Sequence, residues 1–208
     1  LFNLQGEREQ GHRAWESEYR ITARGNLDYV LPYSKTGKIE AGYQYYSYLE
    51  DSKYEMQFWN PETKTFYWRD DIYNTSYFRE NVNSVYAILS ENLRALEIQA
   101  GVRGEYTHTR GKGGDISQNY FSLFPNANVS YALTKDGAYS LIAQYARTIE
   151  RPRFWSLNPQ RFQISDYTYQ TGNPELDPAY KQDISLTLVL KHKYTLTGGM
   201  TIQRDEIQ

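Results

Sequence analysis

Polar and apolar side chains alternate along this chain with a period of two, and this pattern constrains the fold more than any other feature. From Glu18 to Leu31 the sequence is EYRITARGNLDYVL, in which the odd positions are mostly apolar or aromatic and the even positions almost all polar. Successive side chains of a strand point to opposite faces, so the pattern predicts a β-strand with one apolar face. Strands of globular proteins have about five or six residues, so an alternation of this length favours a strand that crosses a membrane.

The spacing of aromatic residues supports this interpretation. Tyr19 and Tyr29 share a face and lie ten residues apart, and Phe121 and Tyr131 repeat that spacing. Ten residues of strand extend roughly 33 Å, and a tilt of about 40° projects this length onto roughly 25 Å. That is the height of the lipid-facing band between the two aromatic girdles of an outer-membrane barrel.

Similar patterns predict about eight strands, of which the one near 79–90 is the least clearly phased. Nine residues are predicted to face lipid because they share the apolar parity of their strands: Tyr19, Ile21, Leu27, Tyr29, Leu141, Ala143, Leu186, Leu188 and Leu196. Pro125 has the parity of Phe121 and Tyr131, and proline cannot donate to a strand ladder, so the strand must either bulge there or begin near Asn126. Of the two we expect a β-bulge.

The links between the predicted strands alternate in length. Short links are predicted at Pro32–Gly37, Glu91–Leu93, Thr134–Gly137 and Lys191–Lys193, and longer ones at Asp51–Tyr77, Thr109–Asn119 and Arg151–Ala179. Outer-membrane barrels have short periplasmic turns and longer extracellular loops. The pattern therefore predicts an antiparallel up-and-down transmembrane β-barrel architecture, with the loops that contain Trp59 and Trp155 outside the cell, opposite Lys35 and Asp136.

Composition excludes several other classes. No stretch approaches the roughly 20 apolar residues of a membrane-spanning helix, and the 21 Tyr suit a surface that is wet on one side and apolar on the other. The formal charge of −2, without a basic tract, argues against a nucleic-acid partner. The chain has no Cys, so it has neither disulfides nor thiolate metal ligands.

No catalytic motif is present, and we expect no enzyme, metal site or cofactor. None of His12, His108 and His192 has a second ligand at a metal-binding spacing. The Gly-rich run Arg110–Asp115 lies between two alternating segments and is expected to be a flexible loop. His108 with Glu105 and Asp115 is the one local candidate for a catalytic rim.

From Tyr120 onward the sequence resembles the outer-membrane β-barrel domain of TonB-dependent receptors. The resemblance rests on YFSLFPNANVSYAL, SLIAQYARTIERPRFWSLNP and TGNPELDPAYKQDISLTL, and on the Gly-x-Arg-x-Glu pattern within Ala100–Thr109. It covers about Ala95 to Asp205. Its motif residues are Arg151, Pro152, Asn158, Pro159, Gly172, Asn173, Pro174, Leu176 and Pro178. We expect them to fold a long loop rather than to contact a ligand, since proline and glycine restrict and permit particular backbone conformations.

The resemblance implies that residues 1–208 are one part of a barrel of roughly 22 strands in the bacterial outer membrane. Such receptors capture a scarce nutrient, and the TonB complex drives its uptake through a plug domain. Neither a plug nor an export signal is recognisable in the sequence, so we expect a fragment or a processed chain. The expected partners are outer-membrane lipid, a small-molecule or oligomeric nutrient (an iron chelate, a cobalamin-like compound, a glycan or a peptide) and TonB through the absent plug.

Four aromatic residues are candidates for ligand contact. Trp59, Phe66 and Trp68 fall in the predicted loop Asp51–Tyr77, and Trp155 follows the Arg-Pro motif. Such rings stack on sugars, heterocycles and chelate rings alike, or else pack the loop on itself.

Two other architectures stay open on the sequence. Eight strands could close as a complete small barrel with a structural or adhesive role, or the chain could be a soluble extracellular β-sandwich that binds sugars. The larger barrel predicts an open, curved sheet whose terminal strands, Glu18–Leu31 and Tyr194–Ile202, do not pair with each other.

Overall fold

One large antiparallel sheet makes up most of the molecule. The computed structural model describes residue 6 and residues 10–68, 74–112, 116–159, 162–165 and 168–204. The main sheet has the order β1-β2-β4-β5-β6-β7-β10-β11, with β3 paired to β2, and β8 and β9 form a separate hairpin. Every neighbouring pair is antiparallel, so the predicted up-and-down arrangement of eight strands is confirmed.

The element bounds are β1 His12–Pro32, β2 Gly37–Asn60, β3 Thr65–Trp68, β4 Asn74–Leu93, β5 Leu96–Lys112, β6 Ser117–Ala132, β7 Tyr139–Glu150, α1 Phe154–Leu157, β8 Phe162–Ser165, β9 Thr168–Gln170, β10 Ala179–Leu190 and β11 Tyr194–Arg204. No described helix is long and apolar enough to cross a membrane.

The register gives the sheet two chemically different faces. Leu196 pairs with Leu188, Leu188 with Leu141, and Leu141 with Tyr131. At the other edge Leu27 pairs with Tyr43, and the ladder continues through Val85 and Gly104 to Leu123 on the same face of β6. All nine residues that were predicted to face lipid therefore share this face, which we call the apolar face. The opposite, polar face carries residues such as Glu40, Gln44, Gln99, Asn128 and Thr187.

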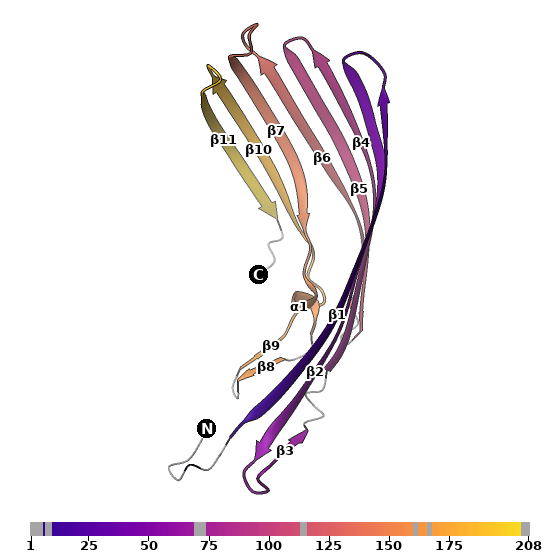
Figure 1. The fold of residues 1–208 in the computed structure, drawn as a ribbon, viewed down its shortest axis with the longest axis vertical. Coiled ribbons are helices and arrows are strands. Elements are labelled where there is room, and N and C mark those ends of the chain that lie inside the picture. The colour runs from indigo at the N-terminus through magenta and orange to yellow at the C-terminus, as the bar shows by residue number, and fades with distance from the viewer. Residues whose placement is uncertain are drawn as a thin grey trace.

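Among the described residues, no protein layer covers the apolar face. Leu27 is 72% exposed, Leu196 69% and Phe121 62%. Apart from the separate hairpin of β8 and β9, the described strands form one continuous curved sheet in place of two facing sheets, so the sandwich alternative does not describe this fold (Figure 1). A contiguous apolar surface of this extent is typical of a membrane or protein interface.

Turns join the strands at one end of the sheet, and longer segments join most of them at the other (Figure 1). The turns at 33–36, 94–95, 133–138 and 191–193 occupy the first end. Three of the four short links match the prediction. The fourth was placed three residues too early, because Glu91–Leu93 belong to β4 and the turn is Arg94 and Ala95.

Two of the predicted long loops are mostly strand, which corrects the prediction. Asp51–Asn60 continue β2, Asn74–Tyr77 begin β4, and the link between β5 and β6 shrinks to residues 113–116. The reason is a change of face: from Tyr54 to Phe58 the apolar side chains of β2, such as Met56, have the parity of the polar face, and the apolar parity returns only at Trp59. A β2 of 24 residues extends roughly 80 Å, far beyond a lipid-facing band of about 25 Å.

The predicted bulge at Pro125 is absent. Pro125 pairs with Val102 in an unbroken register along β6, whereas the ladder between β6 and β7 begins only at Asn126. Leu123, which has the same parity, directs its carbonyl oxygen toward β7, where Arg147 Nη1 donates to it at 3.3 Å. The nitrogen of Pro125 therefore points toward β7 at a position before the β6–β7 ladder begins. No backbone hydrogen bond of the sheet is lost because proline lacks an N–H there.

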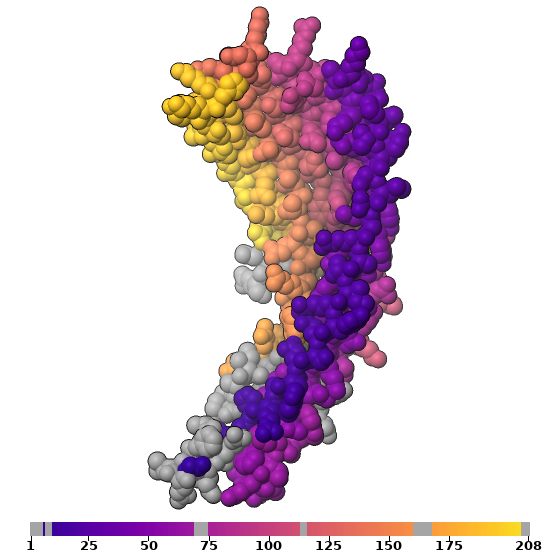
Figure 2. All heavy atoms as spheres, viewed as in Figure 1, coloured from indigo at the N-terminus to yellow at the C-terminus, as the bar shows by residue number. Residues whose placement is uncertain are grey.

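β1 and β11 lie at opposite ends of the strand order and do not pair with each other among the described residues. The prediction of an open sheet is confirmed to this extent. The space-filling view shows the result as a curved band, with β1 along one margin and β11 along the other (Figure 2).

Candidate functional site

The segment between β7 and β10 folds back over the polar face of the sheet, and Figure 1 shows α1 on the concave side. Gln118 of β6 donates from Nε2 to the carbonyl oxygens of Leu176, at 2.8 Å, and Pro174, at 3.3 Å. These bonds fasten the second half of the motif to the sheet. Pro178 is buried where β10 begins.

The two halves of the motif pair with each other. The backbone N–H of Gly172 donates to Asn158 O, and that of Asn173 donates to Ser156 O, both at 2.7 Å. A Cβ atom at Gly172 would lie 2.6 Å from Ser156 O and 2.7 Å from Trp155 O, so only glycine permits this approach. Asn158 is almost fully buried, and Pro159 O accepts a bond from Thr171 Oγ1 at 2.9 Å. These contacts support the expected loop-folding role of the motif.

A small hydrophobic cluster holds α1 against the strands. Its buried members are Phe78, Ile116, Phe154 and Leu157, and Tyr48, Trp155 and Leu176 pack against them. The rings of Phe78 and Phe154 lie 5.4 Å apart, as do those of Phe154 and Trp155. The Arg-Pro motif thus leads into a turn of helix whose side chains face the sheet, with Pro152 buried beside them.

A charged network lies beside the cluster. Glu105 is 7% exposed and accepts bonds from two guanidinium groups, those of Arg103 (Nε, 2.5 Å) and Arg151 (Nη2). Arg103 Nη2 also donates to Gln44 Oε1 at 2.7 Å and to Ser84 Oγ at 2.9 Å. The network joins the Gly-x-Arg-x-Glu strand to the Arg-Pro motif. The sequence predicted both motifs but not the contact between them. An ion pair between Arg151 of one motif and Glu105 of the other could have been predicted from their opposite charges.

A pocket of about 360 Å³ opens between the strands and the start of this segment. Three features define it. Trp155, Tyr46 and Tyr48 supply aromatic surface, Arg151 and Pro152 supply part of its wall, and Arg20 and Glu50 supply charge.

Glu50 has an unused acceptor in this pocket. It is 3% exposed, and its Oε2 accepts a bond from the Tyr48 hydroxyl and lies 3.5 Å from Arg20 Nε. Its Oε1 atom is buried and has no hydrogen-bond partner among the described residues. A buried acceptor without a partner is costly, and a ligand with a hydroxyl or amine donor would satisfy it.

The other three predicted ligand-binding residues lie elsewhere. Trp59 pairs with Phe66, and Trp68 pairs with Gln57, in the hairpin of β2 and β3. The Trp59 and Phe66 rings are 5.1 Å apart, and Trp68 lies 5.5 Å from Trp15 of β1. By register these four rings have the parity of the apolar face, whereas Trp155 is on the polar face. The structure therefore does not bring Trp155 together with Trp59, Phe66 and Trp68.

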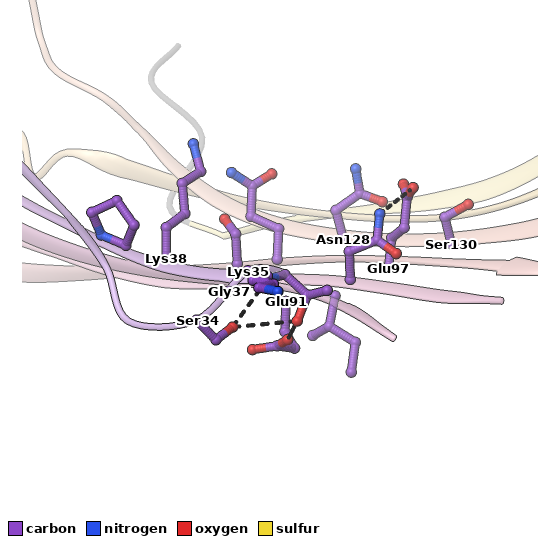
Figure 3. Close-up of a pocket in the computed structure, with 14 residues that line it drawn as sticks. Ser34, Lys35, Gly37, Lys38, Glu91, Glu97, Asn128 and Ser130 are labelled. Carbon is purple, nitrogen blue, oxygen red and sulfur yellow. Dashed lines mark hydrogen bonds between the residues drawn. The ribbon is translucent and has the colours of Figure 1, made fainter. Parts of the chain in front are cut away.

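A second cavity, of about 520 Å³, lies at the short-turn end of the sheet (Figure 3). Its polar groups largely bind one another: Thr36 Oγ1 donates to Glu91 at 2.6 Å, and Asn92 Nδ2 donates to Glu97 at 3.1 Å. Bonds from Thr36 and Tyr33 hold the pKa of the Glu91 carboxyl below its ordinary value. The cavity is larger than the Trp155 pocket but has no aromatic residue in its lining, so we regard the Trp155 pocket as the candidate ligand site.

The catalytic candidate does not assemble. His108 and Glu105 are three residues apart on β5 and so have opposite parity, which places them on opposite faces of the sheet. Asp115 lies outside the described residues. Among the residues that the structure describes, no group of three or more His, Cys, Asp or Glu could hold a metal ion.

Comparison with known proteins agrees with this architecture. A model described as the outer membrane protein beta-barrel family matches residues 2–208. The copper transporter OprC has a similar fold, with a TM-score of 0.68 and 11% identity, over 92% of this chain and 31% of that one. The ferric citrate transporter FecA in its unliganded form has a TM-score of 0.55 and 11% identity, over 94% of this chain and 29% of that one. This chain thus spans about three tenths of either structure. No curated protein sequence matches it.

Proposed function

Because the chain belongs to the outer membrane protein beta-barrel family, we propose that it forms part of the wall of a TonB-dependent transporter that takes up a scarce nutrient. Family membership gives the bacterial outer membrane as its location. The observation that carries the proposal is the fold-back of residues 151–178 over the polar face, since this segment builds a pocket on the side that would line the barrel.

In this proposal the apolar face contacts lipid and the polar face lines the lumen. Every strand edge within hydrocarbon must be paired, because each unsatisfied backbone group there costs several kcal/mol. The unpaired edges of β1 and β11 would therefore pair with further strands of a wider barrel.

The register supports this orientation through the tilt that it implies. Phe121 pairs with Tyr106, and the ladder continues through Asn83 and Tyr45 to Gly25 of β1. Gly25 is six residues from Tyr19. Suppose that Tyr19 and Phe121 belong to one aromatic girdle. The girdle then moves about 20 Å along the strand direction, which is the length of six residues, while it crosses about 19 Å of sheet, which is the width of four strand spacings. The strands would then tilt by about 45°, close to the 35–45° typical of outer-membrane barrels.

The size of the matched transporters supports a larger assembly. Since the chain corresponds to about three tenths of OprC or FecA, we assign the plug and the TonB-contacting segment to sequence beyond these residues. The transported nutrient would then reach the plug along the polar face.

The ligand is proposed to bind in the Trp155 pocket, between an aromatic ring and the unpartnered oxygen of Glu50. Cobalamin-like compounds, glycans, peptides and those iron chelates that contain rings offer a ring or apolar surface together with hydrogen-bond donors. FecA is described as a ferric citrate transporter, and ferric citrate is an iron chelate without such a ring. The hairpin aromatics Trp59 and Phe66, which are half-buried, and Trp68, which is exposed, are the second candidate, because they offer stacking surface beyond the proposed lipid band.

Calorimetric titration of the intact receptor against these four ligand classes tests the proposal. For the ligand that binds, Trp155→Ala is expected to weaken affinity at least about fivefold, since aromatic contacts contribute about 1 kcal/mol beyond area burial. Trp68→Ala is the matched control and should leave affinity unchanged. Loss of binding on Trp68→Ala with full binding on Trp155→Ala would move the site to the hairpin, and failure of every class to bind would contradict a receptor role.

A further inference from the structure

A third cavity, of about 550 Å³, opens on the apolar face, on the side opposite the Trp155 pocket. It lies between β4 and β5 and is lined by Arg79, Arg110, His108, Asn81 and the ring of Tyr45, among others. Arg79 has the parity of Val85 and Leu89, and Arg110 that of Tyr106 and Val102, all of them exposed on the apolar face. Two arginines therefore project from the same surface as the proposed lipid contacts.

The charges of this pocket are not balanced. Arg79 and Arg110 are direct cross-strand partners, and like charges in that position destabilise a sheet. No carboxylate lines the cavity. Among the described residues, neither guanidinium forms an ion pair, even with Asp51, which pairs with the neighbouring Tyr77. An anion between the two arginines would remove the repulsion.

The donors suit a phosphate group. Guanidinium groups bind phosphate oxygens through paired N–H donors, and an anion lying between two of them would receive several charge-assisted bonds. The amides of Asn81 and Asn83 and the hydroxyl of Tyr77 add neutral donors around the rim, and the Tyr45 hydroxyl donates to Asn81 Oδ1 at 3.0 Å. The volume leaves room for a sugar attached to the phosphate.

The depth of the pocket indicates where the phosphate comes from. The outer aromatic girdle is taken as the line from Tyr19 on β1 to Phe121 on β6. Relative to the cross-strand register, this line shifts by about one and a half residues from each strand to the next, so it crosses β5 near His108 and β4 near Glu80. The arginines thus lie at or just beyond the outer aromatic girdle, with the exposed apolar residues Val85 and Val102 on the membrane side. Lipid headgroups occupy this level of a bilayer.

We propose that the pocket of Arg79 and Arg110 binds the phosphate of an outer-leaflet glycolipid headgroup. The inference rests on the proposed orientation, in which the apolar face contacts lipid. It adds a fixed lipid site to the outside of the barrel wall, separate from the nutrient pocket on the polar face.

The test is native mass spectrometry of the full-length receptor with three probes: diphosphoryl lipid A, dephosphorylated lipid A and inorganic phosphate. The wild-type protein is expected to retain diphosphoryl lipid A, to release the dephosphorylated form and to bind inorganic phosphate only weakly. Arg79→Gln with Arg110→Gln should lower retention at least tenfold. This double variant also removes the like-charge pair, so the loss would not result from a weakened fold.

The matched control is Lys38→Gln with Lys181→Gln, which removes two positive charges from the polar face and should retain the lipid. Equal retention by the arginine variant and the wild type would overturn the proposal, as would equal loss in both double variants. Displacement of the lipid by equimolar inorganic phosphate would overturn the lipid assignment. Failure of the lipid site can be distinguished from failure of the proposed nutrient site. The arginine substitutions should leave nutrient binding unchanged, and Trp155→Ala should leave lipid binding unchanged.

Discussion

At the scale of single residues, Glu105 is a nearly buried carboxylate that joins several elements of the structure. It receives bonds from both Arg103 and Arg151, one from its own strand and one from the segment that covers it. Arg103 also reaches β2 and β4 through Gln44 and Ser84. One carboxylate thus couples three strands to the fold-back segment, and it separates two guanidinium groups that would otherwise repel each other.

Glu105→Gln is expected to loosen residues 151–178 by about 2 kcal/mol, because hydrogen bonds to charged groups contribute about 1.5–3 kcal/mol. Protease sensitivity of this segment in the folded receptor is the measurement. Glu40→Gln removes a carboxylate whose partner, Lys38, is 47% exposed, and should change little. Equal protease resistance of Glu105→Gln and the wild type would contradict the anchoring role of the network.

Leu188 and Thr187 test the assignment of faces. They are adjacent on β10 and therefore point to opposite faces, with Leu188 in the row that joins Leu141 and Leu196. Leu188→Arg is expected to destabilise the receptor by about 2–4 kcal/mol in lipid vesicles, the cost of a cation near mid-bilayer, and Thr187→Gln should be mild. Equal losses in urea unfolding would mean that the faces are assigned wrongly.

At the scale of elements, alternation predicted the strands because each strand has one apolar face and one polar face. The prediction failed where the apolar side chains of a strand move to its other face. From Tyr54 to Phe58 the apolar residues of β2 change face, and the prediction ended the strand although the backbone ladder with β1 and β4 continues. The fold-back of 151–178 depends on contacts between distant residues, such as Gln118 with Leu176, which no local pattern records. The family motif marked this segment but not the surface on which it lies.

The arrangement of links predicts the sidedness of the wall. Single Cys substitutions at Trp59 and Trp155 should react with a membrane-impermeant maleimide in whole cells, and substitutions at Lys35 and Asp136 only after the outer membrane is permeabilised. The chain has no native Cys to interfere. Labelling at position 136 without labelling at 59 would invert the topology.

At the scale of the whole molecule, the sheet has the features of a barrel wall and lacks a large hydrophobic core in its described residues. Among the described residues few apolar side chains are buried, and half of these gather where α1 packs on β4, while many large apolar side chains are exposed on one face. Such a wall is stable only when lipid covers that face and other strands cover both edges. The unpaired edges of β1 and β11 argue against the small eight-stranded barrel, in which those two strands would form a ladder.

Refolding of the 208-residue chain alone in detergent tests this account most directly, read from its migration on gels with and without heating. A wall that needs further strands at both edges is predicted to aggregate through those edges and to give no heat-modifiable monomer. A heat-modifiable monomer with a direct ladder between β1 and β11 would contradict the account and show that the chain closes as a barrel by itself.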